Sequence, residues 1–131
     1  MQNRRINPET IPAPIGLYTH AMEVGPNSRW LVASGQIGID AAGKVPEGIA
    51  AQAEIVWTNL IRILEANTMR MSDVVKINHF LTRREDLAGY NAVRNKYLGD
   101  NRPASTLLIV VGLARPEFLV EVEIVAARAV E

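Results

Sequence analysis

Two glutamates interrupt an apolar segment near the end of the chain. Glu121 and Glu123 alternate with valines within residues 118–127. A buried carboxylate is unfavourable unless it is paired, protonated or hydrated. Because side chains alternate along a strand, the two glutamates are expected on one face of it. A carboxylate in that setting can hold a water molecule and exchange a proton with it, so Glu121 is the first candidate for a general base.

Structural explanations for the same residues remain open. Glu121 could simply face solvent, and Glu123 could form an ion pair; the cations considered for it are Arg128, Arg115 and Lys76. The two histidines, His20 and His79, have no Asp or Glu nearby at ligand spacing, so no metal site is expected. His79 lies at an otherwise apolar parity, which favours a buried residue with satisfied hydrogen bonds over a catalytic base.

Composition excludes several function classes. The 131 residues fit one domain, spanning 1–131, with residues 1–14 as an extended, proline-containing arm. The 14 basic and 14 acidic residues cancel, which disfavours nucleic acid as a partner. No cysteine, no secretion signal and no membrane-length apolar run are present, so we expect a cytoplasmic protein without a membrane partner.

Periodicity predicts two helices and five strands. Apolar residues recur at helical spacing over residues 48–67 and 84–98, and Gly99 is typical of a helix end. Strand patterns occupy the segments 18–24, 29–37, 74–82, 105–113 and 118–128. The turn signal at 25–28 predicts that the first two strands form a hairpin.

This order of elements predicts an α+β domain with two layers. Both helices are expected on one face of a single mixed sheet. Residues 106–113 are apolar at both parities, so this strand requires cover on both sides. Two helices cover only one side, and we therefore expect other copies of the chain to cover the second face in a symmetric oligomer.

The sequence resembles the RidA (YjgF) family of reactive-intermediate deaminases, once described as endoribonucleases (L-PSP) or translation inhibitors. The segments that carry the resemblance cover nearly the whole chain; they are Ile15-Gly16-Leu17-Tyr18, Ser34-Gly35-Gln36-Ile37, Asn91, Arg102-Pro103-Ala104-Ser105-Thr106 and Val120-Glu121-Val122-Glu123. The resemblance implies a chorismate-mutase-like fold and a homotrimer with a central β-barrel. It also implies small-molecule clefts between subunits, hydrolysis of enamines or imines to a keto compound and ammonia, and no cofactor.

Roles follow for individual residues. The resemblance implies that Glu121 positions the attacking water, while Tyr18, Ser34, Gly35 and Asn91 shape the cleft. Each of these four has a structural alternative. Tyr18 is as often a core residue, the Ser34-Gly35 segment could be a bulge or turn, and Asn91 could lie on a helix surface.

One departure from the family pattern affects substrate preference. Members with imine deaminase activity carry Pro-Ala-Arg-Ser where this chain has Pro103-Ala104-Ser105-Thr106, and their arginine holds the substrate carboxylate. Ser105 offers one neutral hydrogen bond in place of a charged bidentate pair. Leu107 makes the same region more apolar. Arg102 is a candidate to replace the missing anion contact; otherwise it is solvated or pairs with Asp100.

The sequence therefore predicts a divergent deaminase with altered substrate preference, with 2-aminomuconate among the substrates to consider. The first alternative is a catalytically silent trimer that binds a small metabolite for sensing or regulation. An endoribonuclease or translation inhibitor is the third hypothesis, and the zero net charge disfavours it.

Overall fold

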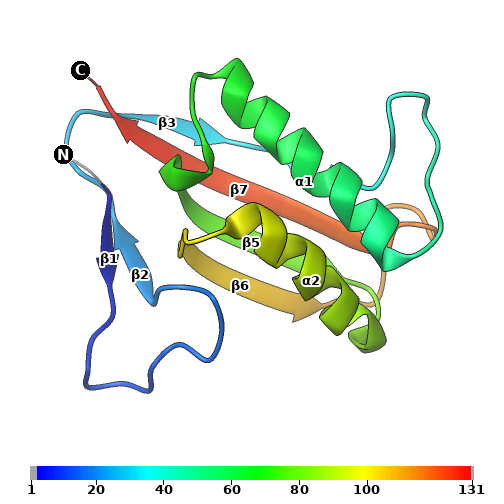
Figure 1. Ribbon diagram of the computed structural model, residues 1–131, viewed down its shortest axis with the longest axis horizontal. Helices are drawn as coiled ribbons and strands as arrows, with labels where there is room; N and C mark the ends of the chain where they lie inside the picture. The colour runs from blue at the N-terminus through cyan, green and yellow to red at the C-terminus, as the bar shows by residue number, and fades with distance from the viewer. Residues whose placement is uncertain (1–2, 131) are drawn as a thin grey trace.

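The main sheet carries both helices on the same side (Figure 1). The computed structural model describes residues 3–130. The strand order is β3 (Ser28–Val32), β7 (Val120–Ala129), β5 (Val74–Leu81) and β6 (Ala104–Ile109), and β4 (Gln36–Ile37) also pairs with β7. β5 and β6 are parallel, whereas the other pairs are antiparallel. The predicted α+β fold with a mixed sheet is confirmed.

The helices use their apolar stripes to cover the sheet. α1 (Ile49–Ala66) matches the predicted helix 48–67 within one residue at each end, and α2 (Leu87–Leu98) follows a short 3-10 turn, η2 (Arg84–Asp86). A second 3-10 turn, η1 (Met71–Asp73), leads into β5. The buried apolar residues of α1 are Ala53, Val56, Trp57, Leu60 and Leu64. No helix formed within residues 3–130 is long and apolar enough to cross a membrane.

Among the described residues, 3–130, only one face of the sheet is covered. Val120, Val122 and Ile124 point toward the helices and are buried. On the opposite face, Trp30 and Val32 of β3 remain 55% and 75% exposed. We call this second side the open face. Its apolar exposure agrees with the expectation that the chain alone does not complete its packing.

The predicted hairpin between residues 18–24 and 29–37 is wrong. β2 (Ala21–Glu23) pairs instead with β1 (Arg4–Ile6) in a separate two-stranded sheet, visible beside the main sheet in Figure 1. β3 pairs with β7. The reason is burial, since β3 gains a place beside the central strands and packs Leu31 against the core, whereas β2 remains mostly exposed.

The fourth predicted strand, 105–113, is shorter than expected. β6 ends at Ile109, and the Val110 N–H still donates to the carbonyl oxygen of Leu81, the last residue of β5. Beyond that point β5 offers no further backbone partner. The chain therefore leaves the sheet, and Val111 is fully exposed.

Candidate functional site

Glu121 lies against the backbone of Gly35. The two segments meet because β4 pairs with β7, with Ile37 opposite Glu121. A Cβ atom built on Gly35 would stand 2.0 Å from Glu121 Oε2, so a larger residue at position 35 would force the carboxylate to move. None of the ion pairs formed within residues 3–130 includes Glu121. The carboxylate is half-buried, lies close to the Gly35 backbone and forms no ion pair within residues 3–130.

Glu123 shares the open face with Glu121, as the parity predicted. It accepts a hydrogen bond from the Asn78 side chain at 3.1 Å. The ion pair considered for Glu123 with Arg128, Arg115 or Lys76 does not form. Asn78 lies directly opposite Glu123 in the β5–β7 register, so a short amide replaces the expected cation.

Ser34 and Gly35 lie in the irregular segment between β3 and β4, which both pair antiparallel with β7. The Ser34 carbonyl oxygen accepts a bond from the Gln36 side chain at 3.2 Å, and Ser34 is exposed. This segment and Glu121 form one group, which we call the Glu121 cluster. It lies on the open face, and it combines a carboxylate with nearby main-chain groups.

Ser105 belongs to a second group on the helix side of the sheet. Parallel pairing places Leu107 of β6 opposite His79, and Ser105 two residues earlier faces the same side. His79 Nε2 lies 2.9 Å from Ser105 Oγ, and His79 Nδ1 is hydrogen-bonded to the Tyr90 hydroxyl from α2. We call Ser105, His79 and Tyr90 the Ser105 cluster.

Burial sets the electrostatics of this cluster. His79 is 1% exposed, and its ring centroid lies 6.2 Å from that of Trp57. Desolvation lowers the pKa of His79 to about 3, with Arg94 and Lys76 adding to the effect. Desolvation also raises the pKa of Tyr90, against a smaller lowering by the Trp57 indole N–H. Both rings are therefore neutral at physiological pH.

Tyr18 and Asn91 have distinct places near this cluster. The Thr19 N–H donates to the Pro103 carbonyl at 3.2 Å, and a parallel bridge joins Thr19 to Ala104, so the segment carrying Tyr18 runs along the start of β6. The Tyr18 hydroxyl accepts a bond from the Ile15 N–H at 3.3 Å. Asn91 follows Tyr90 on α2, and its Oδ1 is buried without a hydrogen-bond partner among the described residues.

Arg102 makes its hydrogen bonds within the loop that follows α2. Its Nη1 donates to the carbonyl oxygens of Gly99 at 2.7 Å and Asn101 at 2.8 Å, so it closes the loop that follows α2. Arg94 donates to the neighbouring Asn95 side chain, and burial lowers the pKa of Arg94. Leu107 packs against the hydrophobic core beside the Ser105 cluster.

The two groups lie on opposite sides of the sheet. In the register of β5, Phe80 is opposite Glu121, while the preceding residue, His79, is opposite Val122 and faces the helices. The structure therefore brings Glu121 together with Ser34 and Gly35, and it brings Ser105 together with Leu107 and the Tyr18 segment. One chain does not bring Glu121 to Ser105.

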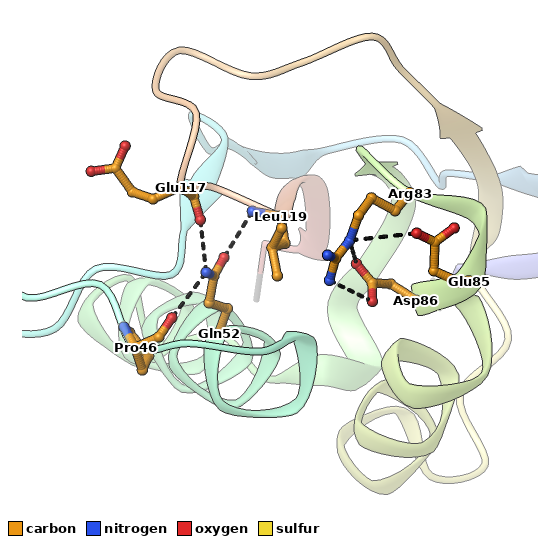
Figure 2. Close-up of polar contacts among 7 residues, drawn as sticks. All are labelled: Pro46, Gln52, Arg83, Glu85, Asp86, Glu117 and Leu119. Atoms are coloured by element: carbon orange, nitrogen blue, oxygen red, sulfur yellow. Dashed lines mark hydrogen bonds and ion pairs between the residues drawn. The ribbon is translucent and has the colours of Figure 1, made fainter.

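Near the start of α1, a group of polar side chains forms its hydrogen bonds within the chain. Figure 2 shows the Gln52 amide bound to Pro46, Glu117 and Leu119, at distances between 2.9 and 3.0 Å. Arg83 forms a bidentate pair with Asp86. These residues border a pocket of about 450 Å³. The buried polar atoms at this pocket already have hydrogen-bond partners. We therefore interpret these contacts as structural, and the pocket is not the candidate site.

The contact between His79 and Ser105 was not anticipated from the sequence. His79 was expected in the core and Tyr90 on an apolar helical stripe, and both expectations hold. Their shared contact with Ser105 depends on the parallel register of β5 and β6, which local patterns do not specify.

Comparisons with known proteins agree with this architecture over nearly the full length. The family model described as Endoribonuclease L-PSP matches residues 8–128. A 2-iminobutanoate/2-iminopropanoate deaminase of Escherichia coli (strain K12) is 30% identical over 130 residues, covering 96% of this chain and 98% of the relative. A protein of the same name from Dermatophagoides farinae is 34% identical over 114 residues, 86% of this chain and 87% of the relative.

Solved structures show the same arrangement. A Rid family protein of Yersinia pestis, YyfB, described as of unknown function, superimposes with a TM-score of 0.82 at 29% identity, covering 98% of this chain and 100% of that one. RidA from an Antarctic Psychrobacter gives a TM-score of 0.70 at 35% identity, covering 94% and 98%.

Proposed function

The chain belongs to the RidA/YjgF/RutC (endoribonuclease L-PSP) family, and from this premise we propose that it hydrolyses the C–N bond of a small enamine or imine to a carbonyl compound and ammonia. Relatives named as imine deaminases at 30% and 34% identity support this reaction class. The proposal extends to a substrate preference that differs from theirs, because Ser105 stands where the resemblance implies an arginine.

The observation that carries the proposal is the Glu121 carboxylate packed on Gly35. A half-buried carboxylate without a cation is free to accept a hydrogen bond from water. The glycine lets main-chain groups come close to a ligand at the same point. Together they provide a proton acceptor beside a place where a planar substrate can bind.

The reaction needs no cofactor in this scheme. Water adds to the imine carbon as Glu121 accepts its proton, and a C–O bond forms while the C=N double bond becomes single. The proton then passes from Glu121 to the nitrogen. The C–N bond then breaks as the carbonyl forms, and the hydroxyl proton of the intermediate passes through Glu121 to the nitrogen, which leaves as ammonia.

We propose that the open face is covered by neighbouring copies in a homotrimer, with a cleft formed between subunits. The exposed Trp30 and Val32 support this assembly, since single chains rarely leave a contiguous apolar sheet face in water. Val32→Lys should dissociate the assembly, as measured by analytical ultracentrifugation. Ala88→Lys, on the exposed surface of α2, is the matched control and should not. A wild-type protein that sediments as a monomer contradicts the assembly.

The activity is tested by ammonia release from freshly generated imines and enamines, including simple 2-imino acids, their amides and 2-aminomuconate. We expect turnover of at least one substrate and a fall of about 100-fold or more in kcat/KM for Glu121→Gln, the usual range for loss of a general base. Glu123→Gln is the control on the same strand, because Glu123 already bonds to Asn78. Equal effects of the two substitutions contradict the role of Glu121.

A metabolite-binding protein without catalysis is the second candidate, favoured by the neutral Ser105 at the implied arginine position. It predicts ligand-dependent thermal stabilisation without ammonia release from any substrate in the panel.

A further inference from the structure

The Ser105 hydroxyl is held from the core side by a buried histidine. His79 bonds to Ser105 through Nε2 and to Tyr90 through Nδ1, so the three side chains form one continuous chain of hydrogen bonds. His79 and Tyr90 are buried, whereas Ser105 is half-buried. The open end of the chain is therefore the serine.

The direction of these hydrogen bonds follows from counting protons. A neutral imidazole has one N–H donor and one acceptor. If Tyr90 donates to Nδ1, then Nε2 carries the proton and donates to Ser105 Oγ. The serine proton is then free for another acceptor. In the opposite arrangement Nδ1 donates to Tyr90, and the serine proton is consumed by Nε2.

The buried tyrosine decides between the two arrangements. The one hydrogen bond that Tyr90 makes through its hydroxyl within residues 3–130 is the bond to His79. In the opposite arrangement the tyrosine proton has no acceptor, and a buried unsatisfied donor is costly. The first arrangement gives the donors of both His79 and Tyr90 an acceptor.

His79 is an orienting group in this cluster and not a base that activates a serine nucleophile. Burial and the nearby cations Arg94 and Lys76 disfavour its protonated form. No carboxylate hydrogen-bonds to His79 within residues 3–130, in contrast to a Ser-His-acid arrangement. A proton that moved from Ser105 to His79 would therefore not be stabilised there.

We propose that Ser105, oriented by Tyr90 through His79, is a specificity-determining residue that donates a single neutral hydrogen bond to the substrate carbonyl of an uncharged imine or enamine. This inference rests on the proposed function and defines its substrate class. The favoured substrates carry an amide or ester where 2-imino acids carry a carboxylate. Arg94 donates to the Asn95 side chain and Arg102 to backbone carbonyls, and within residues 3–130 neither guanidinium hydrogen-bonds to Ser105. A dicarboxylate such as 2-aminomuconate should then be a poor substrate.

The tautomer is measured directly by nitrogen NMR of wild-type protein labelled at histidine, with His20→Gln used to assign the two histidines. We expect His79 to be neutral with its proton on Nε2 between pH 6 and pH 8. A proton on Nδ1, or an imidazolium at pH 6, overturns the proposal. Because the measurement uses the wild type, it does not depend on the folding of a variant.

The substrate class is measured with two stable product analogues, pyruvamide and pyruvate, whose binding is followed by NMR shift perturbation. We expect wild type to bind pyruvamide about 10-fold more tightly than pyruvate. Ser105→Ala should lose about 2- to 12-fold in pyruvamide affinity, the range for one neutral hydrogen bond. Ser105→Arg should reverse the preference. A wild type that prefers pyruvate overturns the proposal.

These outcomes separate the two proposals. Absence of ammonia release from every substrate contradicts the deaminase function, while pyruvamide preference still shows the donor role of Ser105. Ammonia release from 2-imino acids together with pyruvate preference supports the deaminase and overturns the specificity proposal.

Discussion

The buried neutral state of His79 predicts a loss of stability in mild acid. The unfolded chain binds a proton at this histidine with a pKa near 6.5, whereas burial lowers the folded pKa to about 3. As the pH falls below about 6.5, the unfolded state gains a proton that the folded state excludes. The contribution of His79 is therefore fully present above the unfolded pKa and declines as the pH falls toward the folded value.

The magnitude follows from linkage. Each pH unit within this window lowers the free energy of unfolding by about 1.4 kcal/mol. Between neutral pH and pH 4.5 the loss attributable to His79 is thus about 2 to 3 kcal/mol. Because the side chain is 1% exposed, solvent screening does not reduce this figure much.

The assay is urea denaturation at pH 7.0 and pH 4.5, at one protein concentration, for wild type, His79→Gln and His20→Gln. Other groups also titrate, so the informative quantity is the difference between wild type and variant in the change of unfolding free energy. We expect His79→Gln to be less stable than wild type at pH 7.0. On acidification, its free energy of unfolding should fall by about 2 to 3 kcal/mol less than that of wild type. The free energy of unfolding of His20→Gln should fall on acidification by as much as that of wild type. A loss of equal size in wild type and His79→Gln refutes the reasoning, since His79 would then titrate alike in both states.

Two further substitutions test the joints that place the candidate site. Gln52→Leu should lower the free energy of unfolding by about 3 kcal/mol in urea titrations, because it leaves backbone groups of Pro46, Glu117 and Leu119 without partners. The control is Ala51→Leu on the exposed side of α1, which should change the free energy of unfolding little. Gly35→Ala should displace the Glu121 carboxylate and lower deaminase kcat/KM. Adding Gly35→Ala to Glu121→Gln should cause little further loss of kcat/KM. If the two substitutions instead lower kcat/KM by independent factors that multiply, the proposed contact is contradicted.

Local patterns predicted the elements that bury a clear apolar set. The apolar stripe predicted the bounds of α1 to within one residue at each end, because Ala53, Trp57 and Leu60 recur at helical spacing. The alternation in β7 placed Glu121 and Glu123 on one face. Both features depend on residues close in sequence, and the signal is strong wherever one face is buried.

Pairings between distant segments were less predictable. The turn at Asn27 looked like a hairpin signal, but β3 pairs with β7, about 100 residues further along the chain. β1 has only three residues and few apolar ones, so its pairing with β2 left no periodic trace. The Ser105 cluster likewise depends on the β5–β6 register, which brings together His79 and Ser105, 26 positions apart in the sequence.

The separation of the two clusters links catalysis to assembly. Glu121 and Gly35 lie on the open face, while Ser105 and His79 lie on the helix side, and the sheet stands between them. A rigid sheet cannot bring both to one substrate, so a cleft that contains both needs Glu121 from one copy and Ser105 from another. In the proposed trimer, a chain dissociated by Val32→Lys would keep its fold but hold only half of each cleft. Mixing Glu121→Gln chains with Ser105→Ala chains should then form some wild-type clefts in mixed trimers and raise the activity above the mean of the two separate variants, whereas a site made within one chain would leave the activity at that mean.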